Sequence, residues 1–152
     1  MTHFNNEEYQ TLASDLIGDI FYTSTSYRGK ISTLRQYAEI VVRKILDIDP
    51  QKEITLGDEE IRKSIQKLPD YKIVELAVKR LKKKGNKTTH TKYRGEVTVE
   101  EFNAAIDGLF DLLSYLLISY FEKYKFGTNG SIMFAFSILP PIIRYKVLMS
   151  LY

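Results

Sequence analysis

The sequence contains no cysteine, and this absence excludes several kinds of chemistry. Without a thiol the protein has no disulfide framework, no thiolate nucleophile and no metal site built on sulfur. The motifs HExxH, GxSxG, GxxxxGKS/T and GxGxxG are absent as well. We therefore expect neither a zinc-dependent nor a nucleotide-dependent enzyme, and we expect no metal and no cofactor.

Long apolar runs are also scarce. The most apolar stretch, residues 109–121, has 13 residues and includes Asp111, Ser114 and Ser119. A helix needs roughly 20 apolar residues to span a membrane. The first ten residues lack the basic and then apolar pattern of a signal peptide. We therefore expect a soluble, cytoplasmic protein without membrane contact, in which residues 109–121 form a buried central helix.

Acidic residues are missing from one part of the chain. Positions 79 to 94 hold eight basic residues and no acidic one, although the whole chain has 22 basic and 19 acidic residues and a net charge of +3. This basic block favours an anionic partner, RNA or DNA. A solvated helix end explains the same charges equally well, because cations are favoured at helix C-termini. The candidate nucleic-acid-binding residues are Lys79, Arg80, Lys82, Lys83, Lys84, Lys87, Lys92 and Arg94.

The apolar residues recur at helical spacing, and no segment shows a convincing strand alternation. The 152 residues are about the length of one domain. We therefore predict an all-α protein: a single antiparallel bundle of about five to seven helices, with a core over residues 28–125 and a helical extension over residues 126–152. The expected helices cover residues 5–26, 30–46, 58–68, 70–84, 98–125, 131–139 and 142–152.

Several residues mark expected helix ends. Thr98-Val99-Glu100-Glu101 has the form of a capping box, and Asp58 and Asp70 are expected to cap the helices that follow them. Pro69 breaks the first of these helices, and Gly85 suits the left-handed position that follows the second. On this second helix we expect five apolar residues to face inward: Ile73, Val74, Leu76, Ala77 and Leu81.

Charged residues on an early helix repeat at a spacing of four. Arg35, Glu39 and Arg43 follow one another at i,i+4 positions, where opposite charges on a helix surface can pair. We expect Arg35 and Glu39 to form a structural ion pair and Arg43 to extend it.

The segment from Leu81 to His90 combines the groups that carry chemistry. Lysine ammonium groups can hold a phosphate, and an imidazole with a pKa near roughly 6.5 can act as acid or base at neutral pH. With the amide of Asn86, such groups could cleave RNA without a metal by activating its 2′-hydroxyl. A turn with a C-cap Gly85 and a solvated His90 accounts for the same residues without any reaction.

Several motifs occur in an order that resembles a known superfamily. Leu34-Arg35-x-x-Ala38-Glu39 is followed by Thr55-Leu56-Gly57, then by Leu81-x-x-x-Gly85-Asn86-x-x-x-His90 and a long apolar helix. This order is similar to the HEPN superfamily, in particular to the HEPN-like domain at the N-terminus of type I restriction motor subunits and related helicase-like proteins. The resemblance covers residues 28–141, and its most specific part is the Gly-Asn-x-x-x-His segment.

The resemblance implies an antiparallel helical bundle that often dimerises. Catalytic members are metal-independent ribonucleases of toxin–antitoxin, abortive-infection and CRISPR systems. Their motif is an Arg, often followed by a polar residue, and then a His after four to six residues. His90 matches the histidine, Asn86 matches the polar position, and Lys83 or Lys84 stands where the family has Arg. Lysine keeps the charge but lacks the guanidinium fork that binds a phosphate through two hydrogen bonds.

Three functions remain open from the sequence. The first is a non-catalytic interaction module of a prokaryotic or phage defence system, which forms a homodimer or docks to a partner protein and contacts RNA or DNA through the basic block. The second is a HEPN ribonuclease toxin, in which His90 is the general acid or base, Lys83 or Lys84 stabilises the phosphate, and Asn86 orients the substrate. The third is a structural domain at the N-terminus of a larger protein.

Overall fold

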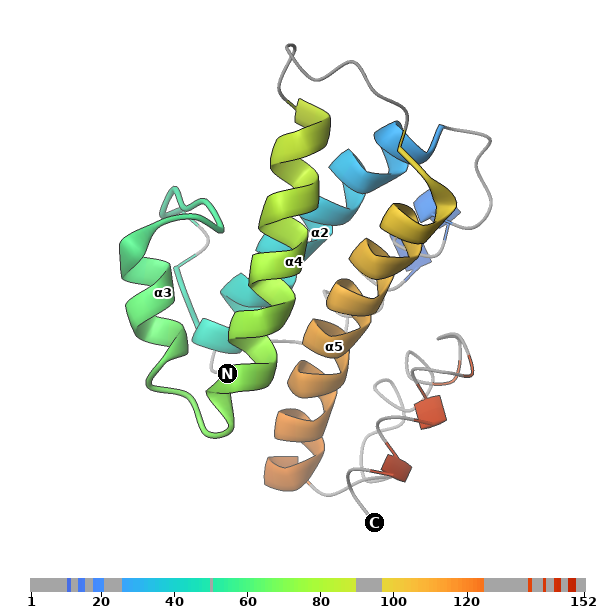
Figure 1. Cartoon of the computed structure of the whole chain (residues 1–152). Coiled ribbons are helices and arrows are strands. Elements are labelled where there is room, and N and C mark those ends of the chain that lie inside the picture. Colours follow the sequence, from blue (N-terminus) through green and yellow to red (C-terminus); the bar gives the residue numbers. More distant parts are fainter. Residues whose placement is uncertain are drawn as a thin grey trace.

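In the computed structural model, the chain forms helices packed around an apolar core (Figure 1). The structure describes residues 11, 14–15, 18–20, 26–49, 51–89, 97–124, 137, 141, 144–145 and 148–149, of which 83–89 and 123–124 are described by their backbone alone. Within these ranges the elements are α2 (Tyr27–Leu46), α3 (Glu59–Ile65), α4 (Tyr71–Thr89) and α5 (Val99–Tyr124). No strand occurs in the described part of the chain, so the predicted all-α class is confirmed.

Two predicted segments lie largely outside the described residues. One is the expected first helix, over residues 5–26, and the other is the helical extension over residues 126–152. The predicted number of helices and the domain limits include these segments and stay predictions.

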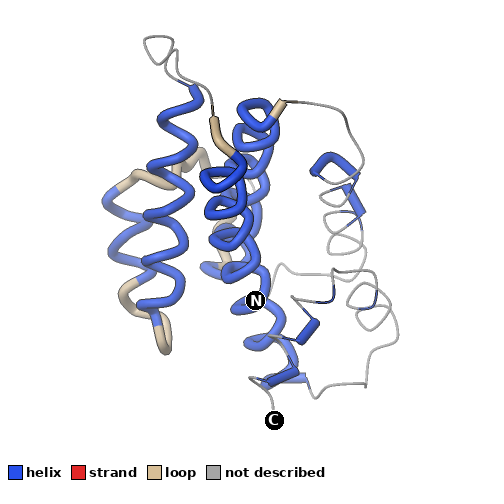
Figure 2. The backbone as a smooth tube through the Cα atoms, turned by 45° about the vertical axis from the view of Figure 1, so that its right-hand side comes forward, coloured by secondary structure: helices blue, strands red, loops and turns tan. Residues whose placement is uncertain are grey.

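Three long helices form the bundle, and the short α3 lies at its edge. α4 runs antiparallel to both α2 and α5, and each of these three helices contacts the other two (Figures 1 and 2). α3 packs against α4. The bundle therefore has an outer side, formed by α3 and α4, on which the first half of the basic block lies.

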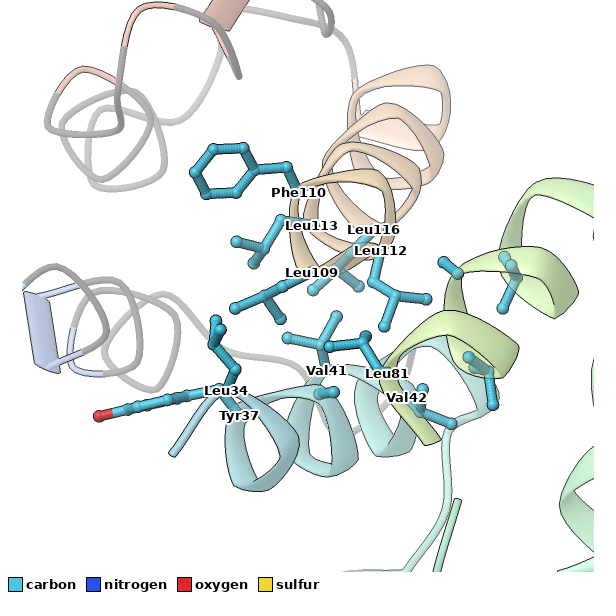
Figure 3. Close-up of a cluster of buried hydrophobic side chains, with 14 of the residues drawn as sticks. Leu34, Tyr37, Val41, Val42, Leu81, Leu109, Phe110, Leu112, Leu113 and Leu116 are labelled. Carbon is cyan, nitrogen blue, oxygen red and sulfur yellow. The ribbon is translucent and has the colours of Figure 1, made fainter. Parts of the chain in front are cut away.

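The core lies between the three long helices. Side chains from α2, α4 and α5 meet there (Figure 3), and Leu34, Val41 and Leu112 are among those with no exposed surface. Gly108 allows α5 to approach α4 closely, because a Cβ at this position would lie 3.3 Å from the backbone oxygen of Ala77. The residues of α5 that are almost completely buried recur at the spacing of a core-facing helix and are Ala105, Leu109, Leu112, Leu113, Leu116 and Leu117.

The apolar character of α5 follows from its place in this core. By length and composition, Val99–Glu122 is the one stretch of the described residues that could cross a membrane. However, 67% of its most apolar window is buried inside the bundle. The finding is consistent with the central helix of a soluble protein, which is the role predicted for residues 109–121.

The helix starts are only partly as predicted. The hydroxyl of Thr98 accepts a hydrogen bond from the backbone N–H of Glu101 at 3.1 Å, which confirms the cap of α5. Asp58 stands at the N-cap of α3, but its side chain makes no capping hydrogen bond and instead accepts two from Thr55. Asp70 precedes α4 with a φ of 50°, whereas an N-cap residue is normally extended. The sequence therefore located these starts, but the predicted capping by Asp58 is wrong.

The C-terminal end of α4 was predicted wrongly. The helix does not end before Gly85 but continues through it to Thr89. A glycine inside a helix costs only about 1 kcal/mol relative to alanine, and the lysines around it are good helix formers. Residues 85–89, which were expected to lie in a turn after a helix over residues 70–84, are therefore helical.

The inward face of α4 is narrower than predicted. Val74, Ala77 and Leu81 are buried as expected, but Ile73 and Leu76 are 53% and 51% exposed. A helix turns by about 100° per residue, so each exposed residue lies to one side of the buried residue that follows it. The neighbours of α4 cover a single stripe, and this leaves Ile73 and Leu76 at the surface.

Candidate nucleic-acid interface

The structure places the predicted site residues in three groups. The site residues with described, exposed side chains on α4 are Lys79, Arg80 and Lys82. The site residues known from the helical backbone of α4 alone are Lys83, Lys84, Asn86 and Lys87. The site residues that lie outside the described residues are His90, Lys92 and Arg94. Much of the basic block is thus a helix surface, and the predicted catalytic set is divided between the helix and the residues beyond it.

The continuous helix gives the basic positions a regular spacing. Positions 79, 83 and 87 are related by four residues, and so are positions 80 and 84. Residues related in this way lie on the same side of a helix. With a rise of 1.5 Å per residue, neighbouring members of such a row stand about 6 Å apart along the axis. The helix therefore aligns two adjacent rows of basic positions.

The cations of the first half of the block differ in their partners. Nη1 of Arg80 lies 3.7 Å from Oδ2 of Asp111 on α5, so its charge is partly matched within the fold. For Lys79 and Lys82, no carboxylate among the described residues lies within ion-pair distance. These two ammonium groups are therefore available to an external anion.

Lys79 and Lys82 also border a pocket. The pocket lies between the turn that precedes α3, α3 itself and the middle of α4, and its volume is about 400 Å³. Its apolar lining consists of Leu56, Ile65 and Val78, all of which are buried. The other residues around it are Gly57 and the polar residues Asp58, Arg62, Gln66, Glu75, Lys79 and Lys82.

Hydrogen bonds within the fold hold the two carboxylates of this pocket. The backbone N–H and the hydroxyl of Thr55 donate to Asp58, and together they hold the pKa of its carboxyl below the usual 3.8. The side-chain amide of Gln66 donates to the carboxylate of Glu75 at 3.2 Å. Both carboxylates thus have donors of their own, whereas Lys79 and Lys82 have no carboxylate partner among the described residues.

Aromatic side chains lie at the end of the bundle where α4 finishes. The rings of Tyr27, at the start of α2, and Phe102, in the first turn of α5, are 5.0 Å apart between centroids. Nζ of Lys30 stands 5.9 Å from the centroid of Phe102, within reach of a cation–π contact. Figures 1 and 2 both show the starts of α2 and α5 at the same end of the bundle as the C-terminus of α4. Because Tyr27 is 42% exposed, this end offers an aromatic surface near the last basic turns.

The early helix agrees with one prediction and corrects another. Nε of Arg35 lies 3.9 Å from Oε1 of Glu39, which confirms the structural ion pair. Arg43 does not extend this pair as predicted but donates to the backbone carbonyls of Lys52 at 2.6 Å and Asp49 at 3.4 Å. Arg43 therefore fixes the loop that leads toward the pocket.

The pocket was not predicted, and its residues show why. They come from the turn at residues 56–58, from α3 at residues 62–66, and from α4 at residues 75–82. Helical periodicity locates each segment but does not say which ones come together. The motif Thr55-Leu56-Gly57 and the helix start expected at Asp58 pointed to the turn but not to its contact with α4.

Among the described residues, no group of three or more His, Cys, Asp or Glu side chains could hold a metal ion.

Comparison with known proteins adds no family to this description. No protein-family model, no curated protein and no solved structure matches the chain.

Proposed function

We propose that the chain is a non-catalytic helical interaction module of a prokaryotic or phage defence system, and that it binds RNA or DNA along the basic side of α4. The observation on which the nucleic-acid part rests is the continuation of α4 through Gly85 to Thr89. This continuation sets the basic positions in rows on a helix. The defence context rests on the resemblance of the sequence to the HEPN superfamily.

The spacing of the basic positions supports a phosphate backbone as the ligand. Rows of cations about 6 Å apart match a polyanion better than a single small ion, because several phosphates can be neutralised together. Such contacts do not depend on base sequence, so we expect binding with little sequence preference. The exposed Tyr27 near the end of α4 is suited to stacking with an unpaired base.

The absence of catalysis is proposed from the basic residues themselves. Lys83 and Lys84 stand where the ribonuclease motif has Arg. An ammonium group attracts a phosphate as a point charge but cannot grip it through two parallel hydrogen bonds. Replacement of arginine by lysine should affect phosphate binding less than catalysis, because stabilisation of a transition state needs hydrogen-bond donors in fixed positions.

The exposed apolar residues of α4 support a protein partner in addition to nucleic acid. Ile73 and Leu76 are about half exposed and lie one turn apart on α4, away from the basic end of the helix. A second copy of the chain or another component of the defence system would cover them. We place this module in the cytoplasm, where both nucleic acid and such partners occur.

The test is the salt dependence of nucleic-acid binding. Fluorescence anisotropy of labelled single-stranded and duplex RNA and DNA is measured at a series of salt concentrations. We expect the logarithm of the affinity to fall linearly with the logarithm of the salt concentration, with a slope of about 0.7–0.9 for each phosphate that is neutralised. Replacement of Lys83, Lys84 and Lys87 together by alanine should lower both the affinity and the slope.

A control variant distinguishes a specific role of the basic side of α4 from an effect of the total positive charge. Lys63 lies on α3, Lys67 in the turn after α3 and Lys72 at the start of α4, so their replacement by alanine removes the same charge from another part of the surface. We expect this variant to keep most of the affinity. Equal losses in the two triple variants, or no binding at low salt, would refute the proposed interface.

A further inference from the structure

The pocket between α3 and α4 combines an apolar floor with unpaired positive charge. Leu56, Ile65 and Val78 are no more than 7% exposed, so they give the pocket a closed apolar side. Lys79 and Lys82 stand on α4 at its rim without a carboxylate partner among the described residues. Ligand pockets typically have this composition, with an apolar lining and a few polar groups that fix the orientation of the ligand.

The charges around the pocket favour an anion. Arg62 is paired with Glu59 at 3.4 Å, and the other charged residues of the lining are the cations Lys79 and Lys82 and the anions Asp58 and Glu75. Both carboxylates already accept hydrogen bonds, from Thr55 and Gln66 respectively. An entering cation would have to compete with these donors, whereas an entering anion meets two ammonium groups that have no carboxylate partner in the described part of the chain.

The turn before α3 keeps one of these ammonium groups at the pocket. A Cβ on Gly57 would lie 3.1 Å from Cε and 3.4 Å from Nζ of Lys82, so the end of the lysine side chain lies directly against this glycine. A side chain at position 57 would push the end of Lys82 away by a few tenths of an ångström. The glycine therefore leaves room for Lys82 to reach across the turn.

The volume sets the size of the ligand. A pocket of about 400 Å³ lies at the lower end of the range of small-molecule sites, roughly 300–1,000 Å³. Inorganic phosphate alone would leave the apolar floor uncovered. A fitting ligand has an anionic group for the lysines and a planar or apolar part for the floor.

We propose that this pocket binds a small organic anion, a phosphate, sulfonate or carboxylate on an apolar body, with the anionic group at Lys79 and Lys82 and the body against Leu56, Ile65 and Val78. This inference goes beyond the proposed function, because the small anion needs only the pocket and none of the basic positions 83–94. The two sites share Lys79 and Lys82, so a bound anion would reduce the positive charge available to nucleic acid.

The probe for the test is 8-anilinonaphthalene-1-sulfonate, an aromatic sulfonate whose fluorescence rises in an apolar site. Its uncharged counterpart, N-phenyl-1-naphthylamine, has the same ring system without the sulfonate. We expect the sulfonate to bind the folded protein saturably with one site per chain. We expect the uncharged probe to bind about tenfold more weakly, which corresponds to about 1.4 kcal/mol.

Variants of the two lysines test the position of the anionic group. Lys79→Met and Lys82→Met together should weaken the sulfonate by about tenfold and leave the uncharged probe unchanged. Lys67→Met and Lys72→Met, which remove the same charge from outside the pocket, should change neither. In ¹⁵N NMR spectra, the sulfonate should shift the amide signals of Gly57 and Gln66.

Three results would overturn the proposal: no saturable binding of the sulfonate, equal weakening in both double variants, or amide shifts confined to residues away from the pocket. Its failure is distinct from failure of the proposed function. The variant with Lys83, Lys84 and Lys87 replaced by alanine should lose nucleic-acid affinity but keep its affinity for the sulfonate. If the sulfonate affinity of this variant falls as much as its nucleic-acid affinity, the pocket is not a separate site.

Discussion

Thr55 holds the carboxylate of Asp58 through two hydrogen bonds, 2.9 Å long from its backbone N–H and 2.8 Å long from its hydroxyl. The pair closes the turn that positions Leu56 and Gly57 at the edge of the pocket. Both donors favour the ionised carboxyl, so the pKa of Asp58 lies below its usual 3.8. A residue predicted to cap α3 therefore stabilises the turn before the helix.

This relationship predicts a pH-dependent effect of Asp58→Asn. Because the pKa is lower in the folded state, ionised Asp58 stabilises the fold above its unfolded pKa, and this contribution is lost as the pH falls through the folded pKa. At about pH 7 the variant should melt at a lower temperature than the native protein, and the difference should shrink as the pH falls through the folded pKa of Asp58. Thermal unfolding followed by circular dichroism measures both. Asp107→Asn, at an exposed position on α5, corrects for the change in net charge.

The same substitution at two positions of α4 tests how much of this helix faces the core. Leu81 is 1% exposed and Leu76 is 51% exposed. Leu81→Ala should lower the free energy of unfolding by about 2–5 kcal/mol, because it leaves a cavity in the core. Leu76→Ala should cost less than about 1 kcal/mol. Urea denaturation gives both values, and similar costs at the two positions would contradict the burial described for α4.

The positions of the long helices along the chain could be predicted from the sequence, because local patterns of apolar and capping residues determine where helices form. Apolar residues at helical spacing located α2, α4 and α5, and the capping box placed the start of α5 at the residue where the structure has it. The ion pair of Arg35 and Glu39 was predictable for the same reason, since both residues lie on one helix. Spacing shows which residues of a helix can meet but not which of them do, since Arg43 also lies four residues from Glu39 and binds the loop carbonyls instead.

Features that depend on packing could not be derived in this way. Ile73 and Leu76 fit a helical apolar stripe, but the neighbours of α4 cover only the part that contains Val74, Ala77 and Leu81. Gly85 is a residue type typical of helix ends, but the lysines around it are good helix formers and α4 continues through it to Thr89. The pocket joins three segments whose proximity follows from the contact between α3 and α4.

His90 gives a direct test of the proposal that the protein binds nucleic acid without cutting it. In a metal-independent ribonuclease, replacement of the general acid or base by alanine abolishes cleavage. We expect the purified native protein to leave a broad panel of RNAs intact, and His90→Ala to bind them with the same affinity. Gel electrophoresis of end-labelled RNA, with the His90→Ala variant as control, measures cleavage. RNA that is cut by the native protein and spared by the variant would favour the ribonuclease toxin.

Gly85 decides whether the basic positions form one helical surface. Inside a helix, glycine is less stable than alanine by roughly 0.5–1 kcal/mol, so Gly85→Ala should raise the free energy of unfolding by up to that amount. If Gly85 instead occupied a left-handed position at the helix end, alanine would be strained there and the protein would lose stability. Gly108→Ala, also inside a helix, should not give the same gain, because its Cβ would lie 3.3 Å from the backbone oxygen of Ala77. Urea denaturation of both variants gives the sign of each change. A loss of stability for Gly85→Ala would mean that α4 ends before Lys87, and the row formed by positions 79, 83 and 87 would then not exist.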